Sequence, residues 1–398
     1  MGLPSPLAAD ALAPPGGAFT TLFRMGHLAS RSLATVALSA ACALLALASV
    51  LAVPASAASS KVPAGWMGVS ATDGSLLGSA PLWTGETAAM KGAGVQSVRV
   101  PFYWTAMQPF GPGPVSFAAS DIVVEGASRQ GLRLLPIVLG TPAWAAADPD
   151  ATRGWSAPRS PAEYGSFLGE LAKRYGPKGT FWAQHPDLPK RAIGTWQVWN
   201  EPDLDAYWAQ QPFAKGYVAL LKAARTALRA VDPKGRIMLA GFPNRSWQSL
   251  EKVYKAKGGK LFDVAAVHGY TGSAANVIRL VDENRDVMAR YRDAKKPIAV
   301  TEMGFSSAPK SVGVPPYVTW NTTEAGQAKK VTELYASLAS KRASRRIEGA
   351  YWYSWYTPET SGKGGWEDYT GLRHLDGEKI VSKPALAAYA KVAKKLRR

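Results

Sequence analysis

The stretch Trp196-Gln197-Val198-Trp199-Asn200-Glu201-Pro202-Asp203 is an apolar, aromatic run that ends abruptly in Asn-Glu-Pro. Such a run is typical of a buried strand, and proline cannot continue a central strand of a sheet. The stretch therefore predicts a carboxylate held at the tip of a strand, next to an amide. The pattern recurs further along the chain, where the apolar run Pro297-Ile298-Ala299-Val300-Thr301 ends in Glu302.

Strand-like and helix-like segments alternate on both sides of these two runs, from residue 65 to the end of the chain. Strands are predicted at residues 66–69, 97–101, 133–139, 193–199, 237–240, 264–268, 298–301 and 347–353. One helical pattern begins at residue 84, and the others cover residues 117–129, 161–175, 214–231, 246–257, 275–292, 322–340 and 383–396. Eight strands, each followed by a helix, predict an α/β fold, the (β/α)8 TIM barrel, as a single domain. A doubly wound sheet usually has fewer strands, and no glycine-rich phosphate-binding pattern follows the first strand.

Local signals agree with these boundaries. Ser160-Pro161-Ala162-Glu163 predicts a helix start, with serine as N-cap, proline at the first helical position and glutamate in the first turn. Asp232-Pro233-Lys234-Gly235 predicts a break before the fifth strand.

The N-terminal segment, residues 1–57, is predicted to lie outside the folded domain, which covers residues 58–398. Arg24, His27 and Arg31 precede an apolar run at 33–53, and Ala55-Ser56-Ala57 offers a small-residue cleavage site. This pattern predicts a secretory signal peptide, cleaved after Ala57, and therefore export. An uncleaved N-terminal anchor is the alternative, because the apolar run is long enough to span a bilayer. Cleavage would also remove Cys42, the only cysteine, so the mature chain could form no intramolecular disulfide.

The chain is strongly basic, with a formal net charge of +18. A basic surface attracts polyanions, nucleic acid included. The lysines and arginines are dispersed along helix-like segments, and we find no zinc-finger or helix-turn-helix pattern, so we expect no nucleic-acid partner. Two interpretations stay open: attraction to an anionic cell wall, membrane surface or acidic polysaccharide, and a solvated surface without a partner. We expect a monomer.

The ends of the predicted strands carry the residues that could do chemistry, since catalytic groups of a barrel gather at the carboxyl ends of its strands. Reading these ends in chain order gives Arg99, Trp104, Trp144, Asn200, Glu201, His268, Tyr270, Glu302, Tyr353 and Trp355. His268 and Tyr270 share one face of their strand, and Glu302 is expected on the face of Ile298 and Val300.

Asn200 and Glu201 pose a geometric problem, because adjacent residues of a strand point to opposite faces. Both can reach one site only if the strand bulges or ends at that pair. Pro202 favours such an ending.

These strand ends resemble the clan A glycoside hydrolases, which are retaining (β/α)8 enzymes. The matching features are Asn-Glu-Pro on strand 4, Thr-Glu on strand 7, Arg on strand 2, His-x-Tyr on strand 6 and Trp on strand 8. The resemblance covers roughly residues 65–398 and is closest to family 39, with family 5 as a neighbour. One departure is strand 3, where many clan members carry a histidine and Gly140-Thr141-Pro142-Ala143-Trp144 has none.

The resemblance implies Glu201 as the general acid/base and Glu302 as the nucleophile. Arg99 would keep Glu302 ionised, while apolar surroundings and Glu302 itself would raise the pKa of Glu201. The resemblance also implies that Asn200 hydrogen-bonds the sugar 2-hydroxyl, that Tyr270 hydrogen-bonds the nucleophile, and that His268 contacts sugar hydroxyls or supports that network. Among the tryptophans, it implies Trp355 as the floor of the subsite for the cleaved sugar, with Trp104 and Trp144 as further platforms.

The sequence thus predicts a secreted, retaining β-glycosidase that hydrolyses O-glycosidic bonds of a poly- or oligosaccharide, with endo action favoured over exo action. A non-hydrolytic glycan-binding protein on the same barrel and a transglycosylase are the alternatives. No cofactor is expected. The four histidines are scattered singly, which does not suggest a metal site, and no Gly-x-Ser-x-Gly motif supports a serine hydrolase.

Overall fold

The computed structural model describes residues 61–151, 155–359 and 364–397. The signal peptide or anchor predicted for residues 1–57 lies outside these ranges. Among the helices of the described ranges, none is both long and apolar enough to cross a membrane.

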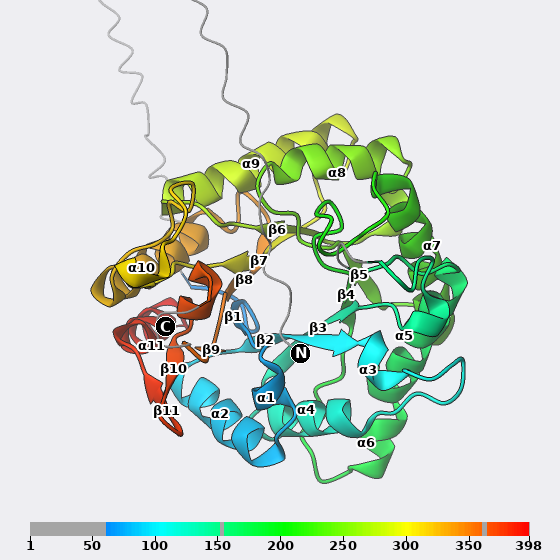
Figure 1. Cartoon of the computed structure of the whole chain (residues 1–398), viewed down its shortest axis with the longest axis horizontal. Coiled ribbons are helices and arrows are strands. Elements are labelled where there is room, and N and C mark those ends of the chain that lie inside the picture. The colour runs from blue at the N-terminus through cyan, green and yellow to red at the C-terminus, as the bar shows by residue number, and fades with distance from the viewer. Residues whose placement is uncertain (1–60, 152–154, 360–363, 398) are drawn as a thin grey trace, which may run out of the picture. The chain divides into compact units, whose positions relative to one another are not determined.

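The described residues form a barrel of eight parallel strands (Figure 1). The strands are β1 (Met67–Ser70), β2 (Ser97–Tyr103), β3 (Arg133–Leu139), β4 (Thr195–Val198), β5 (Arg236–Met238), β6 (Ala265–His268), β7 (Ile298–Met303) and β8 (Ile347–Trp352). Their order is β5-β4-β3-β2-β1-β8-β7-β6. Two isolated parallel bridges, Met238 to Val264 and Phe242 to Val267, join the two ends of this order. The predicted (β/α)8 barrel is therefore confirmed.

An outer ring of helices surrounds the strands (Figure 1). Its members are α2 (Ala80–Ala93), α4 (Ala118–Arg129), α5 (Pro161–Tyr175), α7 (Ala214–Val231), α8 (Ser246–Lys255), α9 (Ala274–Arg290), α10 (Glu324–Lys341) and α11 (Pro384–Arg397). Shorter helices lie in the connections, namely α1 (Gly74–Leu77), α3 (Trp104–Met107), α6 (Thr180–Gln184), η1 (Ala143–Ala145), η2 (Gly259–Leu261), η3 (Lys310–Val312) and η4 (Trp366–Tyr369).

One predicted helix start needs correction, and a second is confirmed. The first long helix begins at Ala80 rather than at residue 84, because Ser79 caps it by accepting the Leu82 N–H. Ser160 does occupy the N-cap of α5, yet its side chain makes no capping hydrogen bond. The Glu163 N–H donates to the Ser160 carbonyl instead.

A small three-stranded sheet follows β8 and was not predicted. It consists of β9 (Tyr356–Thr357), β10 (Arg373–Asp376) and β11 (Lys379–Ser382), with β10 and β11 joined by a tight turn at Gly377. Gly377 has φ 61°, a left-handed conformation that glycine adopts without steric cost. This sheet lies in a segment for which the sequence analysis predicted neither a strand nor a helix.

The barrel interior is divided into an apolar part and a polar part. Side chains from five different strands or strand entrances form one buried cluster inside the ring: Leu135, Met238, Val264, Ala266, Ala299 and Tyr351. Gly68 makes room for the ring of Tyr351, since a Cβ at that position would lie 2.3 Å from Tyr351 Cδ1. The polar groups described next come from the carboxyl ends of the strands, where catalytic groups of such barrels gather.

Candidate active site

The tip of β4 breaks the strand alternation in the way that the sequence required. β4 ends at Val198, and Trp199 and Glu201 both have left-handed backbone, with φ of 68° and 40°. Such conformations are uncommon for residues other than glycine and concentrate at functional sites. They bring Asn200 and Glu201 into the same site, where Asn200 Oδ1 accepts a hydrogen bond from Arg99 Nη2 at 2.8 Å.

The tip of β7 reaches the site by another irregularity. Val267 pairs with Val300, but the next residue of β6, His268, pairs with Glu302, so β7 has one extra residue there. Ile298 and Val300 pack in the outer core, whereas Ala299 belongs to the cluster inside the barrel. The prediction that Glu302 shares a face with Ile298 and Val300 was therefore wrong. The register shift turns Glu302 inward.

Glu302 lies in a dense set of donors. Arg99 Nη1 lies 2.6 Å from Glu302 Oε1, and the Tyr270 hydroxyl donates to Glu302 Oε2 at 2.6 Å. Arg99 is fully buried and is held by Gln197, whose Oε1 accepts from Arg99 Nε at 2.7 Å. Burial by itself would raise the pKa of Glu302. The charges of His268 and Arg99 and the hydrogen bond from Tyr270 outweigh that effect, so the pKa lies below its ordinary value.

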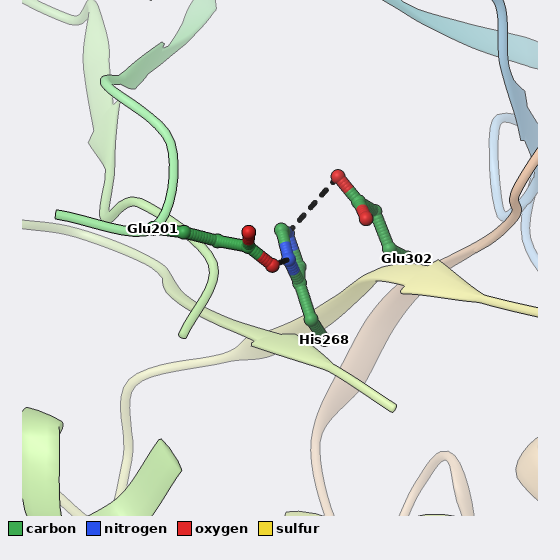
Figure 2. Close-up of side chains that lie close together, drawn as sticks. All are labelled: Glu201, His268 and Glu302. Carbon is green, nitrogen blue, oxygen red and sulfur yellow. Dashed lines mark hydrogen bonds and ion pairs between the residues drawn. The ribbon is translucent and has the colours of Figure 1, made fainter. Parts of the chain in front are cut away.

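Glu201 has fewer partners. Its Oε1 lies 2.5 Å from His268 Nδ1, and the other ring nitrogen, Nε2, lies 3.5 Å from Glu302 Oε1. Figure 2 shows the imidazole standing between the two carboxylates. Burial raises the pKa of Glu201, and His268 only partly offsets this while the charge of Glu302 adds to it. Two neighbouring glutamates thus have pKa values shifted in opposite directions.

The two carboxylates are close together. One oxygen of Glu201, one of Glu302 and a ring nitrogen of His268 all lie within 4.8 Å of one another. Three such groups could hold a metal ion, but the Arg99 guanidinium already places a positive charge against Glu302 and would repel a divalent cation. The arrangement is better suited to proton transfer and nucleophilic attack.

The structure corrects the predicted tryptophan platforms. Trp355 is fully buried, and its indole N–H donates to Glu86 of α2 at 2.7 Å, away from the carboxylates. Trp104 is also fully buried and stacks on Phe167. Neither offers a face to a sugar. Trp144 is half-buried, and its ring packs edge-on against Trp104.

Tyr353, rather than Trp355, is the β8-end aromatic residue that lies beside Tyr270. Its ring is half-buried and packs edge-on against Tyr270 at a centroid distance of 6.1 Å. Burial, and then the charge of Glu302, raise the pKa of the Tyr353 hydroxyl well above its ordinary value. Tyr351 lies inside the barrel, and strand alternation carries Tyr353 to the same face while Trp352 packs outward, as expected. The spacing of Tyr351 and Tyr353 was therefore a usable signal.

Two further groups of half-buried aromatic rings flank the site, and the sequence analysis did not single them out. On the Glu302 side, Trp320 and Trp366 pack against Tyr270 at centroid distances of 5.9 Å and 5.1 Å. On the Glu201 side, Trp155 packs against Tyr103 and Tyr207 at 5.8 Å and 6.0 Å. Trp155 and Trp320 come from loops and Trp366 begins the short helix η4, so no extended strand or helix period marks the direction of these side chains. Flat apolar rings beside polar catalytic groups are suited to sugar rings.

A (β/α)8 barrel with two inward carboxylates of opposite pKa shift, at the carboxyl ends of β4 and β7, defines the glycoside hydrolase class of barrels. The comparison with protein families agrees. Residues 57–356 match the family described as Cellulase (glycosyl hydrolase family 5). The chain belongs to this family, and the predicted resemblance to clan A glycoside hydrolases is confirmed. A search of curated protein sequences found no match.

Solved structures share the fold at low sequence identity. A family 39 glycoside hydrolase from Bacteroides cellulosilyticus WH2 has a TM-score of 0.64 and 18% identity, covering 85% of this chain and 65% of its own length. A monomeric β-xylosidase from Caulobacter crescentus CB15 has a TM-score of 0.59 and 14% identity, with coverages of 81% and 66%. A family 1 β-glucosidase from Thermotoga maritima has a TM-score of 0.58 and 12% identity, with coverages of 84% and 99%. The chain therefore spans about two thirds of the first two proteins.

Proposed function

We propose that this protein hydrolyses β-O-glycosidic bonds of a poly- or oligosaccharide by double displacement, with Glu302 as nucleophile and Glu201 as general acid/base. The observation that carries the proposal is the buried pair itself. Retaining glycosidases hold their carboxyl groups about 5–5.5 Å apart, whereas inverting enzymes need a wider gap for water. Oxygens of Glu201 and Glu302 lie within 4.8 Å of each other, which supports retention.

In the first step, an oxygen of Glu302 forms a bond to the anomeric carbon while the bond from that carbon to the leaving oxygen breaks. The proton of Glu201 goes to the leaving oxygen, so the leaving group departs as a neutral alcohol. Glu302 is ionised for this attack because Arg99 and Tyr270 stabilise its charged form. Asn200, oriented by Arg99, is the proposed donor to the sugar 2-hydroxyl.

In the second step, Glu201 accepts a proton from water, the water oxygen bonds to the anomeric carbon, and the ester to Glu302 breaks. Glu302 carries no charge while it is esterified. One of the causes that raise the pKa of Glu201 is then gone, and Glu201 ionises more easily. The same residue can therefore serve first as acid and then as base.

The proposed substrate is a β-linked glycan chain that is cut at internal bonds, with several sugar units bound on each side of the cleaved bond, which is an endo mode of action. Aromatic rings flank both carboxylates, with Trp320 and Trp366 on one side and Trp155 on the other. The family name, and neighbours described as a β-xylosidase and a β-glucosidase, make β-glucans and β-xylans the first substrates to test.

The test is to incubate purified protein with aryl β-glycosides and with β-glucan and β-xylan chains, and to follow the anomer of the first product by NMR. Retention is expected, and an inverted product would refute double displacement. A 2-fluoro glycoside of the preferred sugar should label the enzyme once, on the peptide that contains Glu302. Labelling of Glu201 instead would reverse the two roles. Products lengthened by an added sugar acceptor would identify a transglycosylase, and binding without turnover would identify a glycan-binding protein.

We also propose that the protein acts outside the cytoplasm, as the signal-peptide pattern before residue 58 suggests, and that its basic surface attracts an anionic wall or glycan. The net charge of +18 supports the second idea. Fractionation of the producing cells, with the N-terminal sequence of the mature form, tests export and cleavage after Ala57. Wall binding should weaken as salt rises, because salt screens exposed charges, and salt-independent binding would refute the electrostatic proposal.

A further inference from the structure

Gly241 lies just beyond β5, between the two strand tips that carry Glu201 and His268. Its carbonyl accepts the backbone N–H of Glu201 at 3.2 Å. The carbonyl of the next residue, Phe242, accepts the backbone N–H of His268 at 3.1 Å. One short segment is therefore joined by main-chain hydrogen bonds to both residues of the closest contact in the site.

The missing side chain of Gly241 is what leaves space for the imidazole of His268. A Cβ at position 241 would lie 1.9 Å from His268 Nε2 and 2.1 Å from its Cδ2, far closer than van der Waals contact allows. The ring is fully buried, so it has no open side into which it could shift. The backbone of Gly241 is not left-handed, so its conformation does not demand glycine. The demand comes from the histidine ring.

We infer that Gly241 is a positioning residue that holds the His268 imidazole between the two carboxylates. This inference rests on the roles proposed above for Glu201 and Glu302. A methyl group at position 241 would push the ring off its place, and the 2.5 Å contact between His268 Nδ1 and Glu201 Oε1 would break. Figure 2 shows that the same ring faces both glutamates, so its displacement would affect both.

Displacement of His268 has a predictable effect on the ionisation of both glutamates. The groups that face them are Arg99, Asp203, Tyr207, His268, Tyr270 and Tyr353, in addition to each other. Of these, only His268 and Arg99 lower the pKa of both carboxyls by their charge. Without His268 in contact, both limbs of the pH–rate profile should move to higher pH.

The experiment compares Gly241→Ala with the wild type and with Gly194→Ala. A Cβ at position 194, just before β4, meets nothing within 4 Å, so this control should keep the activity and the pH profile. Gly241→Ala should lower kcat about 100-fold, with KM changed less than about threefold, because a misplaced proton-transfer network costs rate rather than binding. Both limbs of the pH–rate profile of Gly241→Ala should move to higher pH, as those of His268→Ala should.

The double variant Gly241→Ala/His268→Ala separates positioning from general damage. Once the imidazole is gone, the methyl group has space, and adding Gly241→Ala to His268→Ala should cost less than about threefold. An equal loss in both backgrounds would overturn the inference, and so would wild-type activity of Gly241→Ala. If Gly241→Ala fails to fold while the double variant folds, the conflict with the ring is supported. If both fail, it is refuted.

Thermal unfolding of the wild type, Gly241→Ala, His268→Ala and the double variant gives a readout that needs no substrate. Gly241→Ala should lower the melting temperature of the wild type more than that of His268→Ala, since only the first has an imidazole to displace. An absence of coupling would refute the positioning role whatever the activity. If the wild type hydrolyses no glycoside but the coupling is present, the proposed function fails and the geometric inference stands.

Discussion

The tips of β4 and β7 carry the same side chain into the same site, yet they hold it differently. Glu302 belongs to a strand, is turned inward by a register shift, and contacts Arg99 and Tyr270 directly. Glu201 stands beyond the end of its strand in left-handed backbone and has His268 as its hydrogen-bonding partner. The richer set of donors stabilises the charged form of Glu302, while burial favours the neutral form of Glu201.

The contrast between Glu302 and Glu201 shows that the chemical role of a buried glutamate is set by the number and charge of its hydrogen-bond donors, not by its position at a strand tip. Both glutamates are nearly inaccessible, and burial pushes the pKa of each upward. Only Glu302 has enough nearby positive charge and hydrogen-bond donors to bring its pKa below the ordinary value despite burial. Variants that remove or equalise the compensation test this comparison.

The strongest test exchanges each glutamate for glutamine. Glu302→Gln should lose more than about 10⁴-fold in kcat on every substrate, because no nucleophile remains. Glu201→Gln should lose much less on a 2,4-dinitrophenyl glycoside than on a glycan, since an activated leaving group departs without a proton. The exposed Glu378 in the turn before β11 offers the control Glu378→Gln, which should behave as wild type. Equal losses of Glu201→Gln on both substrates would contradict the assignment.

Arg99→Met removes the strongest difference between the two tips. We expect kcat to fall about 10³-fold, with the acidic limb of the pH profile moving to higher pH as the pKa of Glu302 rises. Stability should fall by about 3–5 kcal/mol, because a buried carboxylate loses its partner. Arg236→Met, which breaks a partly exposed pair with Glu348, is the matched control and should cost less than about 1 kcal/mol. Chemical denaturation and pH–rate profiles measure both effects, and an unmoved acidic limb would contradict the role of Arg99.

Tyr353→Ala and Trp355→Phe distinguish a sugar contact from a core contact on β8. The first should raise KM about tenfold with little change in the melting temperature, since a stacking face is lost. The second should keep KM and lower stability by about 1 kcal/mol, because Glu86 loses the indole donor. Kinetics and thermal unfolding of both variants provide the measurement. The reverse pattern would restore Trp355 as the floor of the subsite.

Asp203, two residues after Glu201, provides a smaller test of burial. Burial raises its pKa to about 7, and its Oδ1 has no hydrogen-bond partner, while Ser249 donates to Oδ2 at 2.7 Å. Its folded-state pKa is above the ordinary value, so the native state binds a proton more tightly than the unfolded chain. Stability from this group is therefore present below about pH 4 and is lost as pH rises through 7.

Asp203→Asn should accordingly remove part of the loss of stability between pH 5 and pH 8, on the order of 1 kcal/mol. The exposed Asp205, two residues further on, supplies the control Asp205→Asn. Melting temperatures at several pH values measure the effect. If Asp203→Asn and Asp205→Asn show the same pH dependence as the wild type, the carboxyl of Asp203 is not held neutral by burial.

Much of the site could be predicted from the sequence because it lies on strands. Arg99, His268, Tyr270 and Glu302 lie within or just after apolar runs whose boundaries are marked by composition, and the structure brings all four together. The errors arose where alternation fails. Trp355 follows the end of β8, where no period fixes its direction, and it turns to α2 instead of the site. Trp155 and Trp320 lie in loops and Trp366 begins the short helix η4, so no strand or helix period fixed the direction of their side chains.

Hydrophobic periodicity and proline act locally, so they can be read from the sequence alone. They were enough to predict the barrel, the strand that bears each glutamate and the break at Asn200 and Glu201. Only the tertiary structure decided how each glutamate turns inward, by left-handed backbone at Glu201 and by a register shift at Glu302. It also decided that the space of Gly241 is filled by His268. These features depend on neighbouring strands that are distant in the chain, and packing against them overrides local preference.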